Sequence, residues 1–428
     1  MSTFSDSLWS ESAIAPVATP PLAGNAETDV AVVGAGFTGL STALHLAEQG
    51  RNVTVLEAQE PGFGCSGRNG GQVNPGSTRM PPQEVLDKLG PDWGERFLQF
   101  GDRSCDLVFE LIDRYGIECE AVRPGYVQGG YGAKGDRANA RWAEQWQARG
   151  VAVQPLDREA LHALIGTRGY DGGLLDPRGG SVQPLSYARG LAKACVDQGV
   201  NVHGSSHVTA INRDGAGWKV GSANGSVNAR YVVLATNGYT DDLWPGLRQT
   251  VVPVTSFIAA TEPLSHNVAA SVVPGRHAVS ETARVIVYYR RDATGRFVIG
   301  GHGNLFNSQE RGDKQHVHNA ALKLFPQLEG VAWEFSWGGW PAMTKDHFPR
   351  LFELDDGVYA GLGYNGRGVA SATLMGQQLA TVIQGSEDPL IRPQPLERFA
   401  FHGMRQAGIS FHLLTRSALD TLDGKPWR

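Results

Sequence analysis

The chain has 428 residues, too many for one ordinary hydrophobic core, so its length predicts two domains. Its formal net charge of -5 argues against the basic face that a nucleic-acid-binding protein needs. The 4 cysteines form no C-x-x-C pair and match no zinc spacing, so we expect free thiols and no metal site.

The first segment, residues 1–27, is rich in Ser, Thr, Ala and Pro, and we interpret it as a surface arm that Trp9 can pin. No Lys or Arg precedes Arg51, whereas a secretory or Tat signal needs a basic start. The chain also lacks an uninterrupted apolar run of about 18 residues, the length of a transmembrane helix. We therefore expect a cytoplasmic protein without a transmembrane segment.

The next segment, residues 28–59, predicts a strand, a helix and a second strand within one βαβ unit. Gly34, Gly36 and Gly39 form G-x-G-x-x-G between the first strand and the helix, which is typical of a pyrophosphate-binding turn. Glu57 ends the second strand 21 residues beyond Gly36, where a carboxylate accepts hydrogen bonds from ribose. The pattern predicts a bound dinucleotide, with Phe37, Thr38 and Ala58 beside these residues.

The loop "CSGRNGGQ", residues 65–72, follows at the carboxyl edge of the predicted sheet. Its small residues allow the backbone to approach a ligand, and its polar side chains can meet phosphate or ring atoms. A flavin needs these additional contacts, whereas a nicotinamide needs only the first unit. We therefore favour FAD over NAD; an ordinary surface loop is the alternative. The predicted contacts are Ser66, Gly67, Arg68, Asn69, Gly70, Gly71 and Gln72.

Further along, residues 83–150 predict mainly helices, and residues 250–305 alternate as strands do. Between them, Val208 begins a strand that can give backbone bonds to adenine. Two other segments end strands at the same predicted edge, and the second starts a helix whose N–H groups could stabilise negative charge on a flavin. Their predicted contacts are Thr236, Asn237 and Gly238, and then Gly366, Arg367, Gly368 and Val369.

These segments predict an α/β (α+β) fold in which a Rossmann-like FAD-binding domain is interleaved with a substrate domain containing a mixed β-sheet. The predicted boundaries are 28–82, 152–245 and 338–385 for the FAD-binding domain, 83–151 and 246–337 for the substrate domain, and 386–428 for a C-terminal tail.

Six segments together resemble the D-amino-acid-oxidase-like superfamily of FAD-dependent oxidoreductases, and most closely γ-glutamylputrescine oxidase-type enzymes. They are "VVGAGFTGLSTALHLAEQG", "FGCSGRNGGQV", "YYRRDATGRFVIGG", "LFPQLEGV", "WGGWPAMTKDHFPRL" and "GYNGRGVA". The resemblance implies a flavin domain built from three stretches and a mixed sheet that roofs the flavin.

Two departures from the superfamily bear on the chemistry. The resemblance implies that members acting on α-amino acids carry an Arg that clamps the substrate carboxylate. In this sequence Pro341 occupies that position. The sarcosine oxidases tether flavin through a C-terminal-region Cys, whereas no Cys follows Cys195. The comparison implies non-covalent FAD and an amine substrate, unless Arg367 supplies the missing cation.

Four side chains are our candidates for the substrate pocket, although packing is the alternative for the aromatic ones. Only one of Tyr288 and Tyr289 can face the cavity, because neighbours on a strand alternate. The four candidates are Tyr289, Trp340, Tyr364 and Arg367.

The predicted reaction is FAD-dependent oxidation of an amine such as γ-glutamylputrescine or another polyamine-derived amine. It would give an imine or aldehyde, and O2 or another acceptor would take the electrons. One alternative is an oxidase or dehydrogenase of an amino acid (a D-amino acid, glycine or sarcosine). A second is a non-catalytic flavin-binding protein. The sequence does not indicate the oligomeric state.

Overall fold

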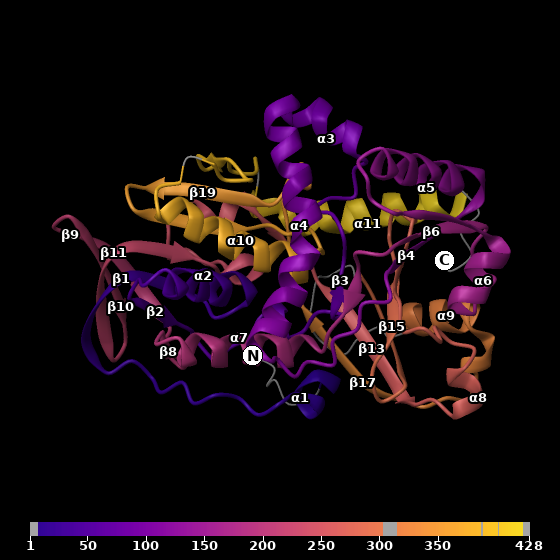
Figure 1. Ribbon diagram of the computed structural model, residues 1–428, viewed down its shortest axis with the longest axis horizontal. Helices are drawn as coiled ribbons and strands as arrows, with labels where there is room; N and C mark the ends of the chain where they lie inside the picture. The colour runs from indigo at the N-terminus through magenta and orange to yellow at the C-terminus, as the bar shows by residue number, and fades with distance from the viewer. Residues whose placement is uncertain (1–6, 303–314, 387, 401, 423–428) are drawn as a thin grey trace.

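Two mixed sheets organise the computed structural model, which describes residues 7–302, 315–386, 388–400 and 402–422. In Figure 1 one sheet and its helices occupy the left, the other sheet occupies the right, and the long helix α4 stands between them. The predicted interleaved α/β architecture is confirmed. Parts of the predicted arm, substrate domain and tail, at 1–6, 303–314, 387, 401 and 423–428, lie outside the described residues.

The first sheet has the order β21-β19-β20-β11-β1-β2-β8, with β10 and β9 joined to β11. Strands β1, β2, β11 and β20 run parallel, so their carboxyl ends meet at one edge. Its strands are β1 (Gly24–Val33), β2 (Val53–Leu56), β8 (Asn201–His203), β9 (Val208–Asp214), β10 (Gly217–Ser222), β11 (Gly225–Leu234), β19 (Arg350–Asp355), β20 (Val358–Leu362) and β21 (Pro393–Gln394).

The second sheet has the order β17-β13-β16-β15-β14-β4-β6-β5 and is mostly antiparallel. Short pairs β3–β7 and β12–β18 lie outside both sheets. The strands are β4 (Tyr126–Gly130), β5 (Gln154–Asp157), β6 (Gly172–Asp176), β13 (Ser256–Pro263), β14 (Ala278–Glu281), β15 (Tyr288–Arg291), β16 (Arg296–His302), β17 (Trp333–Gly339), β3 (Gln72–Val73), β7 (Gly180–Ser181), β12 (Val252–Pro253) and β18 (Ala342–Met343).

Helices α2 and α10 pack together in the largest apolar core, which also includes α4 and α7. Helix α4 starts with Pro91, whose ring suits the first turn, and ends at Gly116, whose φ of 60° is the left-handed cap. The helices are α1 (Leu8–Ser12), α2 (Phe37–Glu48), α3 (Pro82–Leu89), α4 (Pro91–Tyr115), α5 (Gly132–Gln147), α6 (Arg158–Ile165), α7 (Pro184–Asp197), α8 (His266–Ala269), α9 (Gln315–Leu324), α10 (Gly368–Ile383) and α11 (Arg405–Leu422).

Three predicted boundaries differ from the structure. Residues 154–176, expected in the FAD-binding domain, carry β5 and β6 of the second sheet, because β6 pairs with β4 and β5 pairs with β6. Helix α4, expected in the substrate domain, packs instead on α10 of the first. The predicted tail contains β21, which joins the first sheet, and the helix α11.

The described part of the arm is held more firmly than a surface segment requires. Trp9 is 0% exposed and lies edge-on to Trp337, with 5.5 Å between ring centroids. The Arg290 guanidinium lies 4.9 Å from the centre of the Trp9 ring. The prediction that Trp9 pins the arm is therefore confirmed. No helix in the described ranges is long and apolar enough to cross a membrane.

Candidate functional site

A cavity of about 1860 Å³ lies between the two sheets and receives residues from both. Its lining begins at the carboxyl ends of β1 and β2 and continues past β15 to α11. Pockets for single small ligands have volumes of about 300–1,000 Å³. This cavity therefore has room for a dinucleotide and a second molecule.

The first turn of the cavity has the geometry that its glycines predict. Gly34 has a φ of 105°, a conformation that side-chain-bearing residues rarely adopt. A Cβ added to Gly36 would lie 2.8 Å from Ser66 Oγ, and one added to Gly39 would lie 1.9 Å from the Gly34 carbonyl oxygen. Gly36 thus leaves the turn open to a ligand, and Gly39 allows α2 to approach β1.

Glu57 follows β2 and closes the same turn. Its Oε2 accepts a hydrogen bond from the Ala35 N–H at 2.8 Å, and its Oε1 accepts one from the Gln59 N–H at 3.0 Å. Burial raises the pKa of the Glu57 carboxyl, and these two hydrogen bonds oppose that rise. The carboxyl group is therefore fixed beside the open turn, where ribose hydroxyls of a dinucleotide would bind.

The loop 65–72 uses its amide side chains differently from our prediction. Asn69 donates to the carbonyls of Cys65 and Ser66 at 3.0 and 2.8 Å and accepts from the Gly71 N–H. Gln72 donates to the carbonyls of Val279 and Tyr289, both at 3.0 Å. These amide groups serve the loop and its neighbours, because otherwise buried carbonyls would lack donors.

Three successive carbonyls in this loop each accept a hydrogen bond from a side chain of another segment. The acceptors are the carbonyls of Arg68, Asn69 and Gly70, and the respective donors are Trp337 Nε1 at 2.8 Å, Trp9 Nε1 at 2.8 Å and Arg290 Nε at 2.7 Å. Sequence reasoning did not find these contacts, because each joins positions far apart in the chain.

Arg68, for which we predicted a phosphate contact, donates through Nε to the Phe63 carbonyl at 2.9 Å and lies over the Phe63 ring. Cys65 also lines the cavity, and burial raises the pKa of its thiol to about 12. A thiol with that pKa stays protonated at neutral pH and is a poor nucleophile.

Most of the predicted cofactor contacts line the cavity, but Gly39, Gly67 and Gly71 do not. The predicted residues that do are Gly34, Gly36, Phe37, Thr38, Glu57, Ala58, Ser66, Arg68, Asn69, Gly70, Gln72, Val208, Thr236, Asn237, Gly238, Gly366, Arg367, Gly368 and Val369. Segments that are far apart in the sequence are thus brought to one wall.

The pocket aromatics divide between the cavity and the core. Tyr289, our predicted pocket residue, is 1% exposed and packs in the core of the second sheet; Tyr288 lines the cavity instead. Strand alternation decides this, since Tyr288 faces Gly70 and donates or accepts a hydrogen bond with Ser256 at 2.8 Å. Tyr364 lines the wall, where its hydroxyl is 2.5 Å from that of Thr38.

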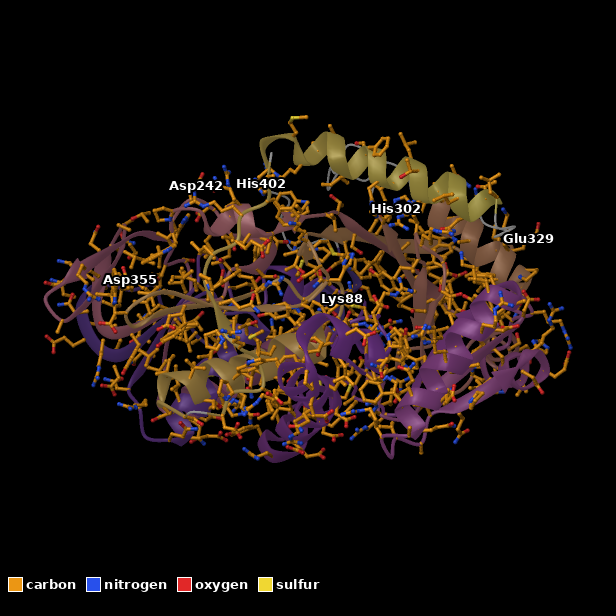
Figure 2. The ribbon with its side chains drawn as sticks, turned by 90° about the horizontal axis from the view of Figure 1, so that it is seen from above. Lys88, Asp242, His302, Glu329, Asp355 and His402 are labelled. Atoms are coloured by element: carbon orange, nitrogen blue, oxygen red, sulfur yellow. The ribbon has the colours of Figure 1, made fainter. Side chains whose placement is uncertain are left out.

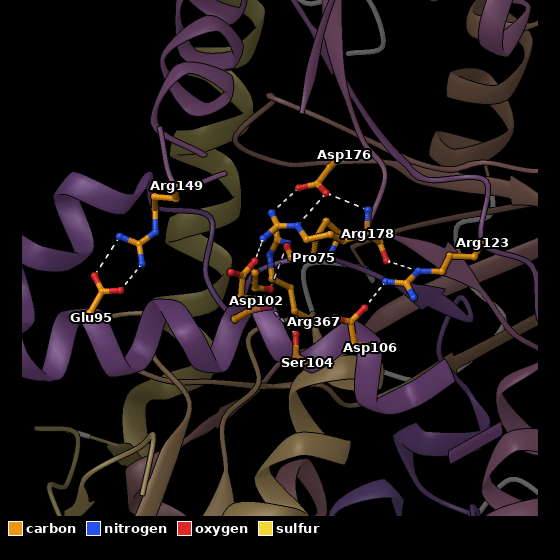
Figure 3. A network of polar contacts seen from close by, with 12 residues as sticks. Pro75, Glu95, Asp102, Ser104, Asp106, Arg123, Arg149, Asp176, Arg178 and Arg367 are labelled. Atoms are coloured by element: carbon orange, nitrogen blue, oxygen red, sulfur yellow. Dashed lines mark hydrogen bonds and ion pairs between the residues drawn. The ribbon is translucent and has the colours of Figure 1, made fainter. Parts of the chain in front are cut away.

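Arg367 lines the cavity wall but is turned toward the protein interior. Its Nη1 donates to the Pro75 carbonyl at 2.5 Å, and only 6% of the residue is exposed. Figure 3 draws Arg367 and Pro75 in close-up. Arg367 is therefore already bound to backbone and is poorly placed to clamp a substrate carboxylate.

Residues that sequence reasoning did not select form the far end of the cavity. Arg79 comes from the bend before α3, His347 from the loop before β19, and Arg416 from α11. His302, labelled in Figure 2, also lines the cavity. No local sequence motif indicates that these three residues belong to a site. For Arg416, the amphipathic spacing of residues along α11 was the one signal that could have predicted a helix there.

FAD fits the cavity's donor and acceptor groups. The glycine turn and Glu57 form the dinucleotide end, as described above. Within the described ranges, Trp340 Nε1 and Asn74 Oδ1 are buried without a protein partner, and both residues line the cavity. Buried polar atoms usually have partners, so a polar ligand is expected to meet them.

Comparison with known proteins agrees with this geometry. Residues 29–382 match the FAD dependent oxidoreductase family. The chain is 36% identical over 391 residues to the γ-glutamylputrescine oxidoreductase of Escherichia coli K12, covering 90% of each. It is 35% identical over 377 residues to the probable oxidoreductase OrdL of Haemophilus influenzae, covering 87% of this chain and 86% of OrdL. Its fold matches the crystal structure of Geobacillus kaustophilus glycine oxidase with a TM-score of 0.73 at 22% identity, covering 88% of this chain and 100% of that one.

Proposed function

Because the chain belongs to the FAD dependent oxidoreductase family, we propose that it oxidises an amine with a neighbouring C–H bond, such as γ-glutamylputrescine or another polyamine-derived amine. The γ-glutamylputrescine oxidoreductase of Escherichia coli, 36% identical, supports this substrate class. The product would be an imine, which water hydrolyses to an aldehyde. The two electrons taken from the amine would pass to O2 or another acceptor.

The observation that carries the proposal is that neither position expected to supply an α-carboxylate clamp does so. Pro341 stands where the resembling amino-acid enzymes have Arg, and proline offers no cation. Arg367, the other candidate, donates to the Pro75 carbonyl. A free α-carboxylate beside that wall would be desolvated without a partner, which costs several kcal/mol.

FAD, when bound, supplies the acceptor for the hydride that leaves the carbon next to the amine nitrogen. The chain's part is to orient the amine and to favour its uncharged form, because only the uncharged form has a free nitrogen lone pair. Tyr288 and Trp340 present ring surface to the cavity that would orient the chain of the substrate.

The charges of the cavity favour the uncharged amine. Three acids are among the described lining residues, and none belongs to the second sheet. Glu57 lies at the dinucleotide end, Glu84 is 4.0 Å from Lys88, and Asp241 is 3.8 Å from His207. An ammonium group over the second sheet would thus meet no carboxylate in the described lining, and desolvation there lowers its pKa.

FAD is proposed to bind without a covalent bond. The one cysteine among the described lining residues is Cys65, whose thiol stays protonated because burial raises its pKa to about 12. Acid precipitation should therefore release all of the flavin into the supernatant. Flavin that stays with the precipitated chain would contradict this statement and leave the amine reaction open.

A second candidate function is oxidation of an α-amino acid that binds at the Arg79 end of the cavity, away from the Gly70 contact. Arg79 lines the cavity and could hold a carboxylate. The two functions separate in anaerobic reduction of the bound flavin, followed by absorbance at saturating substrate. γ-Glutamylputrescine should reduce it faster than D-alanine, glycine or sarcosine; the opposite order would support the amino-acid function.

A further inference from the structure

The far end of the cavity carries a cation that has no ionic partner among the described residues. Arg79 exposes its side chain to the cavity, and Nη2 donates to the Glu281 carbonyl at 2.6 Å. That single hydrogen bond fixes the position of the guanidinium and uses one of its five N–H donors. No carboxylate among the described residues forms an ion pair with it, so the remaining donors are available to a ligand.

The two acids that act on Arg79 accept hydrogen bonds from other groups. The Glu281 carboxylate, 0% exposed, accepts from the hydroxyls of Tyr131 and Tyr170 at 2.6 and 3.2 Å and from the Val287 N–H at 3.0 Å. Asp420 accepts from the Val285 N–H at 3.0 Å and from Arg284. Both acids stabilise the charge of Arg79 from a distance, but neither occupies its hydrogen-bonding edge.

A second cation approaches the same space from α11. Arg416 lines the cavity, is exposed, and pairs with no carboxylate of the described chain. The charges of Arg79 and Arg416 both act on His347, whose pKa is lowered chiefly by burial and further by these two cations. His347 is therefore uncharged within the field of two guanidinium groups, and that combined field attracts an anion.

We propose that Arg79, assisted by Arg416, binds a carboxylate at the end of the substrate remote from the oxidised amine. This inference rests on the proposed amine oxidation and specifies its substrate class: an aliphatic amine that carries a carboxylate at its far end. Arg79 is the specificity-determining residue, because its planar guanidinium can hold both carboxylate oxygens.

The position of Arg79 in the sheet explains why the carboxylate is remote. Tyr288, on β15, faces Gly70 of the flavin loop, whereas Arg79 bonds to Glu281 on the neighbouring strand β14. Arg79 also interacts electrostatically with Tyr126, which lies on β4, the next strand of the sheet after β14. Adjacent strands are about 4.8 Å apart, so Arg79 is displaced from the Gly70 contact by roughly 5 to 10 Å. An α-carboxylate is attached directly to the oxidised carbon and would not span that displacement.

The test uses the FAD-loaded enzyme and compares γ-glutamylputrescine with its α-carboxyl methyl ester, which removes the negative charge and adds one methyl group. The acid should have a kcat/KM about 10- to 100-fold higher than the ester, the usual range for a charged hydrogen bond. Arg79→Gln should remove this preference by raising KM for the acid, while the ester is unchanged. Arg79→Lys should keep part of the preference, since it keeps the charge. Arg213→Gln, an exposed change on β9, is the matched control and should keep all of it.

Binding of glutarate, a dicarboxylate without an amine, provides a readout that needs no turnover. Calorimetry should show about 10-fold weaker binding to Arg79→Gln than to the unmodified enzyme. If both putrescine derivatives fail to reduce the flavin but glutarate still depends on Arg79, the proposed amine reaction is wrong and the anion site stands. If acid and ester react equally well, or Arg79→Gln slows both equally, the carboxylate site is wrong and the amine reaction stands.

Discussion

The two ends of the cavity are fixed in different ways. At the dinucleotide end, glycine backbone forms the wall, and side chains from three segments hold successive carbonyls of the 65–72 loop. At the other end, cationic side chains form the wall, and α11 is held there through the buried Asp420. The first end suits a cofactor that never changes. The second can alter its specificity by replacing side chains without disturbing the first.

The largest expected effect removes the support of the dinucleotide end. Trp9→Ala deletes a fully buried ring and the hydrogen bond to the Asn69 carbonyl. Such deletions cost about 3–5 kcal/mol of unfolding free energy. The Tm should fall, and the affinity for FAD should fall with it because the loop is less well fixed. Trp93→Ala, at a partly exposed site on α4, is the matched control and should cost less. Equal losses in the two variants would show that the arm does not support the loop.

The next effect blocks the dinucleotide end itself. In Gly36→Val the new side chain meets Ser66 Oγ, which also accepts a hydrogen bond from the Phe37 N–H at 3.0 Å. Overpacking of about 1–3 kcal/mol corresponds to a roughly 5- to 150-fold loss of FAD affinity, measured by titration of the apoprotein. In Gly221→Val, on β10, the added Cβ has only Ala210 O within 4 Å, at 3.9 Å, so FAD affinity should not change. A full flavin content in Gly36→Val would place the pyrophosphate elsewhere.

The same difference between the two ends explains what the sequence could predict. The dinucleotide turn depends on backbone conformation within one βαβ unit, and so Gly34, Gly36 and Gly39 reveal it by their spacing. The predicted FAD cofactor is the one named by the family that matches this chain. The parallel strands then bring Thr236 and Gly366 to the same edge, as expected.

The cationic end depends on contacts between distant segments, so no regular spacing of residues in the sequence predicts it. Arg79 and Arg416 lie 337 positions apart in the sequence, yet both line one cavity. The choice between Tyr288 and Tyr289 depends on which face of β15 meets the cavity, and strand alternation alone leaves that open. The backbone contacts of Asn69 and Gln72 were not predicted, because a polar side chain in a loop can serve backbone as readily as a ligand.

A smaller effect is expected at the cationic end. Asp420→Asn keeps the shape of the side chain but loses the charge that strengthens its hydrogen bonds with Arg284 and Val285. Weakening by about 1 kcal/mol should make α11 open about fivefold more often. Limited trypsin digestion after Arg416 should accelerate by that factor, and KM should rise while FAD affinity stays constant. Loss of FAD affinity instead would show that the two ends are not independent.

The smallest effect concerns pH and a histidine behind the dinucleotide end. His45, on α2, is 5% exposed, and its Nδ1 lies 2.7 Å from the Ser41 carbonyl oxygen, which can only accept. Nδ1 therefore carries the proton, and Nε2 is left to accept from Gln377 Nε2 at 3.1 Å. The neutral ring forms hydrogen bonds with both partners. A second proton, on Nε2, would place one N–H donor against another, that of the Gln377 amide. Burial is the main cause that lowers the pKa of His45.

A lowered histidine pKa sets the sign of the pH dependence. The unfolded chain takes up the His45 proton near pH 6.5, before the folded chain does. The stability is therefore complete above that pH and declines as the pH falls below it. Gln377→Glu gives Nε2–H a carboxylate acceptor, raises the pKa of His45 and should reduce the decline. Thermal unfolding of both proteins between pH 7.5 and about 5.5 measures it. An equal decline in both would assign the acid sensitivity to other groups, among them the buried His277, whose pKa burial also lowers.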